Sequence, residues 1–145
     1  MTSDARVDRL LDLFDRLRRM GLDRHPLGAE GISPPQLALL DWVARSPGAR
    51  LREIASGLGL TPPTVSVGMR RLEKAGLVAR QPDPQDRRAV RFFLTPQGEV
   101  LHREARTFRR RKVARLLEGL TPQEQDTLLD LLDRAIGAAE RAQGR

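Results

Sequence analysis

The sequence predicts a mainly helical fold with one small β-hairpin, of the α+β class, in a chain of 145 residues. Apolar residues recur at spacings of three and four along several segments, which is typical of amphipathic helices. Several of these segments begin at a serine or threonine followed by proline, the preferred residues of a helix start. Two short β-prone runs flank a polar loop that contains prolines, which indicates a hairpin.

The first helix is expected over residues 3 to about 20, because its apolar residues recur at helical spacing. Its apolar face consists of Val7, Leu10, Leu11, Phe14 and Leu17. An acidic stripe made of Asp4, Asp8, Asp12 and Asp15 runs along the same helix. Such a stripe is either solvated or faces a basic surface.

Three helices follow in the middle of the chain. The run Ser33-Pro34-Pro35-Gln36 has the form of a capping box, which predicts a helix over about 34–45. A short helix is expected at 52–58, and the glycine that follows it permits a tight turn. Thr61 then suits the N-cap of a helix over about 62–75.

The hairpin and two more helices complete the chain. Residues 77–80 and 89–94 are the two β-prone runs. A long helix is expected from Pro96 to about 118, and Thr121 caps a final amphipathic helix.

The net charge of +7 suggests an anionic partner, although 24 of the 26 basic residues are arginine, a usage that a GC-rich genome alone would explain. The distribution of charge is more informative than the total. Residues 64–101 hold seven basic and four acidic residues, and residues 102–120 hold seven and two. This clustering in two adjacent segments favours a nucleic-acid partner or another anionic one.

Several classes of function are excluded by what the sequence lacks. The chain has no cysteine, so it has no disulfide, thiolate nucleophile or Cys-based zinc site. His25 and His102 have no neighbouring serine or carboxylate pattern that resembles a catalytic triad. We therefore expect no enzyme, no metal and no cofactor. The apolar runs are too short to span a membrane and the N-terminus does not resemble a signal peptide, so we expect a cytoplasmic protein.

The order of elements over 33–98 is that of a winged helix-turn-helix, in which one helix enters the DNA major groove and a hairpin reaches the adjacent minor groove. If Val65, Met69 and Leu72 of the fourth helix face the core, its opposite side carries Pro63, Val67, Arg70 and Lys74, flanked by Ser66 and Arg71. Arg70 could read guanine or bind phosphate, and Val67 could pack on a thymine methyl group. The alternative is that this charged face is only solvated.

Five stretches of the sequence resemble the MarR family (multiple antibiotic resistance regulators). They are LREIA at 51–55, LTPPTVS at 60–66, RLEKAGLVAR at 71–80, DPQDRRAV at 83–90 and LTPQG at 94–98. The resemblance implies a bacterial, homodimeric transcriptional regulator, which binds a palindromic operator and is often released by a small ligand. It also implies three regions: an N-terminal dimerisation helix and loop at 1–32, the winged domain at 33–98, and a linker helix with a dimerisation helix at 99–145.

The family's DNA contacts carry over to individual positions of this sequence. In the recognition helix they fall on Pro63, Thr64 and Val67, with Arg70 and Arg71 as additions. The open face and the cap of the same helix add Ser66, Lys74 and Thr61 to the candidates. In the wing they are Asp86, Arg87 and Arg88. We expect Asp86 to pair with the Arg88 guanidinium and fix its direction for a narrow minor groove, or else to form a simple turn salt bridge. Arg87 suits a phosphate contact. Gly68 inside this helix predicts a soft segment, at a cost of about 1 kcal/mol against alanine.

The dimerisation and effector regions are less clearly marked. The candidate dimer residues are Val7, Leu10, Phe14, Leu17, Leu128, Leu131, Leu132 and Ile136. The arginine-rich run at 106–115 is either a solvated surface, partly paired with the acidic stripe of the first helix, or a site for an anionic effector. An effector pocket would include Trp42, Arg109 and Arg110. Two other roles remain open: a regulator that answers to no ligand, and a winged domain used for RNA or protein contact.

Overall fold

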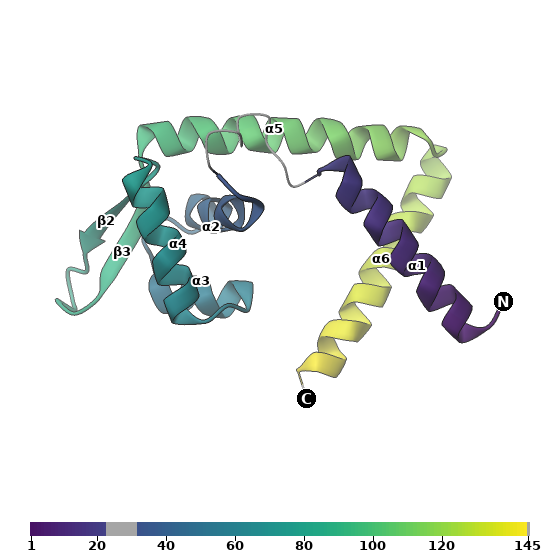
Figure 1. Cartoon of the computed structure of the whole chain (residues 1–145), viewed down its shortest axis with the longest axis horizontal. Coiled ribbons are helices and arrows are strands. Elements are labelled where there is room, and N and C mark those ends of the chain that lie inside the picture. The colour runs from purple at the N-terminus through teal and green to yellow at the C-terminus, as the bar shows by residue number, and fades with distance from the viewer. Residues whose placement is uncertain (23–31, 145) are drawn as a thin grey trace. The chain divides into compact units, whose positions relative to one another are not determined.

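The computed structural model describes residues 1–22 and 32–144, so His25 lies outside the described residues. Within these ranges the chain forms six helices and a small sheet (Figure 1). The helices are α1 (Ser3–Met20), α2 (Pro34–Arg45), α3 (Leu51–Leu58), α4 (Pro62–Lys74), α5 (Pro96–Glu118) and α6 (Pro122–Gln143). The strands are β1 (Ala49–Arg50), β2 (Val78–Pro82) and β3 (Val90–Leu94). The predicted fold class is confirmed.

Side-chain caps begin most of these helices, as the sequence indicates. Ser33 and Gln36 form both hydrogen bonds of the expected capping box, and Thr121 and Glu124 form a second one at α6. Thr61 Oγ1 accepts the backbone N–H of Thr64 at 3.4 Å. Each cap satisfies an amide that the first helical turn leaves without a partner.

The sheet has the order β1-β3-β2, with antiparallel pairing throughout. In the hairpin, Val78 pairs with Leu94 and Pro82 pairs with Val90. Strand β1 joins β3 through the pair Ala49 and Phe92. The sequence did not predict β1, because two residues are too few to show the alternation of a strand.

The chain divides into two compact units, residues 1–109 and 110–145, and the division lies within α5. The core of the first unit lies between α2, α3, α4 and the sheet. Its largest fully buried side chains are Leu40, Val43, Ile54, Val65, Met69, Leu72 and Phe92. Neither α1 nor α6 contains a buried residue.

Across residues 1–22 and 32–144, no helix is both long and apolar enough to cross a membrane. In the same part of the chain, no three or more histidine, aspartate or glutamate side chains are grouped so that they could hold a metal ion.

Candidate nucleic-acid interface

Helix α4 has a buried face and an open face, divided as the sequence predicts. Val65, Met69 and Leu72 are buried in the core. Of the residues proposed to contact DNA, Thr61, Pro63, Thr64, Val67, Arg70, Arg71 and Lys74 are exposed, and Ser66 is half-buried. Thr61 Oγ1 lies 2.8 Å from Thr64 Oγ1, which fixes the first turn of the helix. A groove contact needs an open face of this kind at the N-terminal end of a helix.

Gly68 allows α4 to pack closely on α2. A β-carbon at this position would lie 2.4 Å from Cδ1 of Leu39, a distance shorter than real side chains tolerate. The sequence predicted only a soft helix here. The structure shows a steric reason for the glycine, since the Cδ1 methyl group of the buried Leu39 would have to move to make room for any larger residue.

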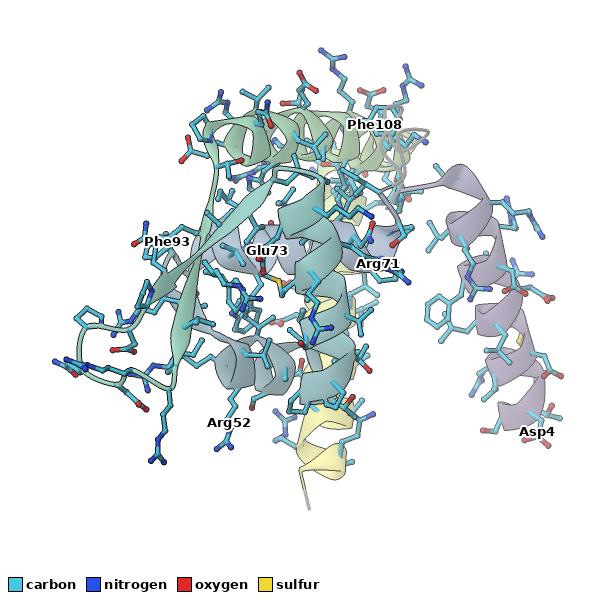
Figure 2. The ribbon with its side chains drawn as sticks, turned by 60° about the vertical axis from the view of Figure 1, so that its left-hand side comes forward. Asp4, Arg52, Arg71, Glu73, Phe93 and Phe108 are labelled. Carbon is cyan, nitrogen blue, oxygen red and sulfur yellow. The ribbon has the colours of Figure 1, made fainter. Side chains whose placement is uncertain are left out.

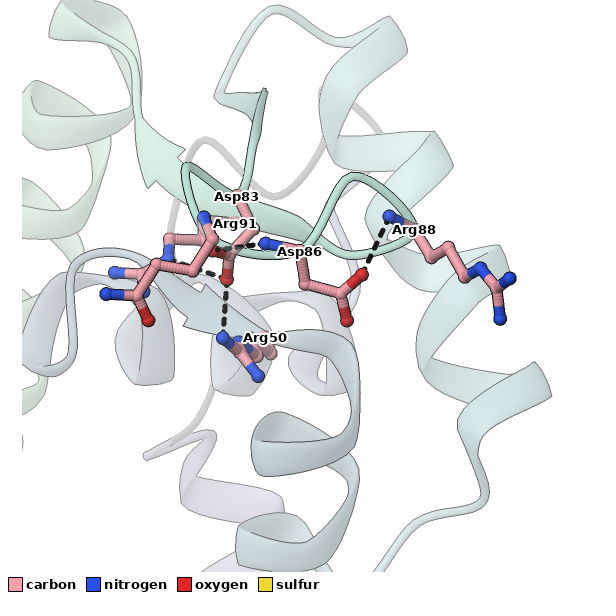
Figure 3. A network of polar contacts seen from close by, with 6 residues as sticks. Arg50, Asp83, Asp86, Arg88 and Arg91 are labelled. Carbon is pink, nitrogen blue, oxygen red and sulfur yellow. Dashed lines mark hydrogen bonds and ion pairs between the residues drawn. The ribbon is translucent and has the colours of Figure 1, made fainter.

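The tip of the wing is organised around Asp83, whose side chain is fully buried with an exposed fraction of 0% (Figure 3). Its Oδ1 accepts hydrogen bonds from the backbone N–H groups of Gln85 and Asp86, at 2.8 and 3.3 Å. Its Oδ2 lies 2.6 Å from Nη2 of Arg50 and 3.1 Å from Nε of Arg91. Both oxygens of the buried carboxylate are therefore satisfied, which burial of a charge requires.

These contacts favour the ionised form of Asp83. The hydrogen bond from the Gln85 backbone, assisted by Arg91 and Arg50, lowers the pKa of Asp83 from 3.8 to about 2, although burial opposes the shift. The carboxylate is thus charged throughout the physiological range. It ties the wing tip to β1 through Arg50 and to β3 through Arg91.

The expected pairing of Asp86 with the Arg88 guanidinium is wrong in its geometry. Asp86 Oδ1 accepts the backbone N–H of Arg88 at 3.0 Å, and the Arg88 side chain extends away from the carboxylate (Figure 3). A short polar side chain commonly bonds the backbone two residues further on, because this closes a tight turn. Asp86 therefore shapes the loop, while the exposed side chains of Arg87 and Arg88 stay free to meet an anion.

The predicted dimer residues leave two apolar faces open to solvent, one in each unit. In α1, Val7, Leu10 and Phe14 are exposed and Leu17 is half-buried. In α6, Leu131, Leu132 and Ile136 are exposed and Leu128 is half-buried. Contiguous apolar side chains on a helix are characteristic of a surface that a partner covers.

The three predicted effector residues are divided between the two units, with Trp42 and Arg109 in the first and Arg110 in the second. The Trp42 ring packs on α3, where a β-carbon on Gly57 would lie 1.9 Å from Cη2 of Trp42. Arg109 and Arg110 are exposed on α5. Within the first unit, a depression of about 270 Å³ has different walls, formed by Val43, Ala44, Pro47, Phe93, Leu94, Glu99, His102 and Arg103.

Comparison with known proteins assigns the family. A model of the MarR family matches residues 30–89. The chain is also 30% identical over 140 residues to the HTH-type transcriptional repressor MdtR of Bacillus subtilis, covering 97% of this chain and 88% of MdtR. The chain belongs to the MarR family. It is therefore a winged helix-turn-helix, DNA-binding transcriptional regulator and not an enzyme.

Two crystal structures extend the likeness of this MarR-family chain. FabT of Streptococcus pneumoniae, crystallised in complex with DNA, has a TM-score of 0.83 and 22% identity, covering 97% of this chain and 99% of FabT. This likeness supports the fold. PcaV of Streptomyces coelicolor, crystallised with its natural ligand, has a TM-score of 0.65 and 29% identity, covering 88% of this chain and 91% of PcaV.

Sequence reasoning missed the anchors that hold this MarR-family wing in place. The sequence pattern assigns no role to Asp83, Arg50 or Arg91. Neither was the ion pair between Glu73 and Arg80 foreseen. The available signal is a carboxylate in a loop that opens with prolines, followed by an arginine in the next strand. It does not specify which partner meets the carboxylate, because that depends on how the sheet folds.

Proposed function

We propose that this protein is a homodimeric repressor of a palindromic DNA operator, with α4 of each protomer in the major groove and each wing in the adjacent minor groove. One observation carries the proposal. A single compact unit combines the exposed N-terminal face of α4 with a wing whose tip is anchored internally by Asp83 while Arg88 points outward. The backbone of the wing is thus fixed and its arginine remains available.

The exposed charges of α4 and the wing support binding to duplex DNA. Arg70, Arg71 and Lys74 are exposed in the second half of α4, and Arg87 and Arg88 are exposed at the wing tip. Cations on these two elements suit the phosphates that border a groove, while Pro63, Thr64 and Val67 suit base edges. Because the operator is DNA, we expect the protein to act in the cytoplasm.

The proposal of a homodimer rests on the two uncovered apolar faces. Helices α1 and α6 have 18 and 22 residues and contain no buried side chain. Helices of this length gain most of their stability from packing of an apolar face. A second copy of the chain would supply that packing, and two-fold symmetry would match a palindrome with half-sites about one turn apart.

We also propose that a small ligand releases the repressor from DNA. The support is that the related PcaV was crystallised with its natural ligand. The candidate residues, taken from the sequence, are Trp42, Arg109 and Arg110, and the two exposed guanidinium groups suit an anionic ligand. The test uses a panel of small carboxylic acids, measuring release of the operator from the parent protein and from the Arg109→Gln/Arg110→Gln variant. Unchanged release by every active compound would refute this site.

Selection of bound duplexes from a random DNA library tests the main proposal. We expect the parent protein to enrich a palindrome with half-sites about one helical turn apart, and Arg88→Ala to bind it more weakly. Uniform, salt-sensitive binding with no enriched motif would contradict operator recognition. Preference for single-stranded RNA, or no nucleic-acid binding at all, would favour a winged domain used for another purpose.

A further inference from the structure

Glu73 and Arg80 form a two-pronged ion pair between the recognition helix and the wing. Arg80 Nε lies 3.1 Å from both carboxylate oxygens of Glu73, and Nη2 lies 2.8 Å from Oε1. Glu73 belongs to the last turns of α4, and Arg80 is the middle residue of β2. Figure 2 shows Glu73 on the side of α4 that faces the hairpin. The hydrogen bond to Glu73 raises the pKa of Arg80 above its ordinary value.

A second contact fixes the other side of the Arg80 guanidinium. Its central carbon lies 5.8 Å from the centroid of the Phe92 ring, at a distance typical of a cation–π contact. Phe92 is a core residue with an exposed fraction of 1%, and it is the β3 residue paired with Arg80 in the sheet. The guanidinium is therefore held between the helix and the hydrophobic core, which leaves it little freedom.

These contacts add a second connection between two elements that the chain already joins directly. Helix α4 ends at Lys74 and β2 begins at Val78, so the main-chain link is a short turn. The ion pair between Glu73 and Arg80 connects α4 and β2 a second time, through side chains. From β2 the chain runs straight to Asp83, whose contacts with Arg50 and Arg91 fix the wing tip to the sheet. The angle between recognition helix and wing is thus held at the middle of β2 by Arg80 and directly after its last residue by Asp83.

Stability alone does not account for this arrangement. The side chains of Arg80 and Glu73 are 49% and 25% exposed, and ion pairs in such surroundings add little to folding stability. A two-pronged arginine pair does, however, fix direction strongly. Moreover, Glu73 places a negative charge beside Arg70, Arg71 and Lys74, where charge alone would weaken attraction to DNA phosphates.

We propose that Glu73 and Arg80 are positioning residues that hold the wing at the angle from which Arg88 reaches the minor groove while α4 occupies the major groove. The inference rests on the proposed function, because it requires that the wing contributes to operator binding. It goes beyond that function by assigning a role to a pair of residues that need not touch DNA.

The test is a double-mutant cycle on the operator selected from the random library, with binding measured by fluorescence anisotropy at one fixed salt concentration. The four proteins are the parent, Glu73→Gln, Arg88→Ala and the double variant. Removing the Glu73 charge should tighten binding if only charge matters. If the pair positions the wing, Glu73→Gln weakens binding about tenfold. The double variant then binds little more weakly than Arg88→Ala alone, because a misplaced wing no longer uses Arg88.

Arg80→Lys separates positioning from direct contact. Lysine keeps the charge but loses the two-pronged geometry and the stacking on Phe92. Positioning predicts that Arg80→Lys weakens binding as Glu73→Gln does. If Arg80 itself contacted phosphate, Arg80→Lys would bind DNA nearly as well as the parent does. Glu73→Gln, which releases the guanidinium, would then bind DNA as well as the parent or better. That pair of results would overturn the proposal.

Two controls make the outcomes distinct. Arg18→Gln removes the exposed ion pair between Arg18 and Asp15 in α1, which joins no two elements, and should leave binding unchanged. Thermal unfolding of Glu73→Gln and Arg80→Lys should stay within a few degrees of the parent. If Arg88→Ala weakens binding but Glu73→Gln does not, only the positioning role fails. If Arg88→Ala has no effect or no operator is selected, the proposed function fails and the positioning role fails with it.

Discussion

Nη2 of Arg50 lies 2.6 Å from the buried Oδ2 of Asp83, and this ion pair ties the wing to the residue that caps α3. Arg50 is also paired with Arg91 in the sheet, and Arg91 meets the same carboxylate oxygen. Two arginines from neighbouring strands thus share one aspartate. The cluster gives the polar loop between β2 and β3 a defined shape without using the exposed arginines of the tip.

Asp83 should make stability depend on pH in the acidic range. The folded-state pKa of about 2 lies below the ordinary value of 3.8, so the ionised carboxylate stabilises the folded state. That contribution is complete above about pH 4 and is lost as the pH falls from there towards 2. Asp83→Asn should therefore be less stable than the parent at pH 7, and the difference should shrink across this window. Urea unfolding of both proteins at a series of pH values measures this difference in the free energy of unfolding. A constant difference down to pH 2 would contradict the lowered pKa of Asp83.

Gly68→Ala should destabilise the protein although alanine is the better helix former. Alanine normally gains about 1 kcal/mol in a helix, but here its β-carbon would lie 2.4 Å from Cδ1 of Leu39. Overpacking of this kind costs about 1–3 kcal/mol. Denaturant unfolding measures the free-energy change, with Val67→Ala on the exposed face of the same helix as a near-neutral control. Leu39→Ala combined with Gly68→Ala should recover part of the overpacking cost, and a purely additive double variant would argue against the contact.

A charged residue on the apolar face of α6 should separate the proposed dimer. Leu132 and Ile136 are 45% and 54% exposed in the single chain, so aspartate there harms folding of one chain little but would be buried in a dimer. We expect Ile136→Asp to sediment as a monomer and to lose binding to a palindrome. Arg134→Asp, on another side of the same helix, is the matched control and should stay dimeric. A variant Ile136→Asp that remains a dimer would exclude α6 from the interface.

Arg87 and Arg88 should differ in how their loss affects binding. Arg87→Ala, which removes a phosphate contact, should weaken binding to all sequences alike and lower the salt dependence by about one counterion. Arg88→Ala, which removes a minor-groove contact, should weaken operators with an A·T-rich narrow groove most. Titration of both variants against operators that differ only in the flanking bases, at several salt concentrations, separates these effects. Equal behaviour of the two variants would show that the tip contacts only phosphate.

Much of the fold could be read from local patterns. The capping box at Ser33 and Gln36 and the threonines before α4 and α6 mark helix starts by chemistry that acts within one turn. The spacing of Val65, Met69 and Leu72 indicates which side of α4 is buried, and therefore which side is open to DNA. The two-residue strand β1 has no such pattern, since its partner on β3 is distant in the sequence.

The sequence by itself determined the helices, the hairpin, the open face of α4 and the family, because spacing, capping and turn residues act between close neighbours along the chain. The tertiary structure decided the roles of individual polar residues and of Gly68. Asp86 bonds a backbone amide instead of the Arg88 guanidinium, Asp83 is the buried centre of the wing, and Gly68 fits against Leu39. Distant segments of the chain that pack together decide which residues are buried. They also decide which groups surround a buried charge or a glycine, and no local pattern specifies that packing.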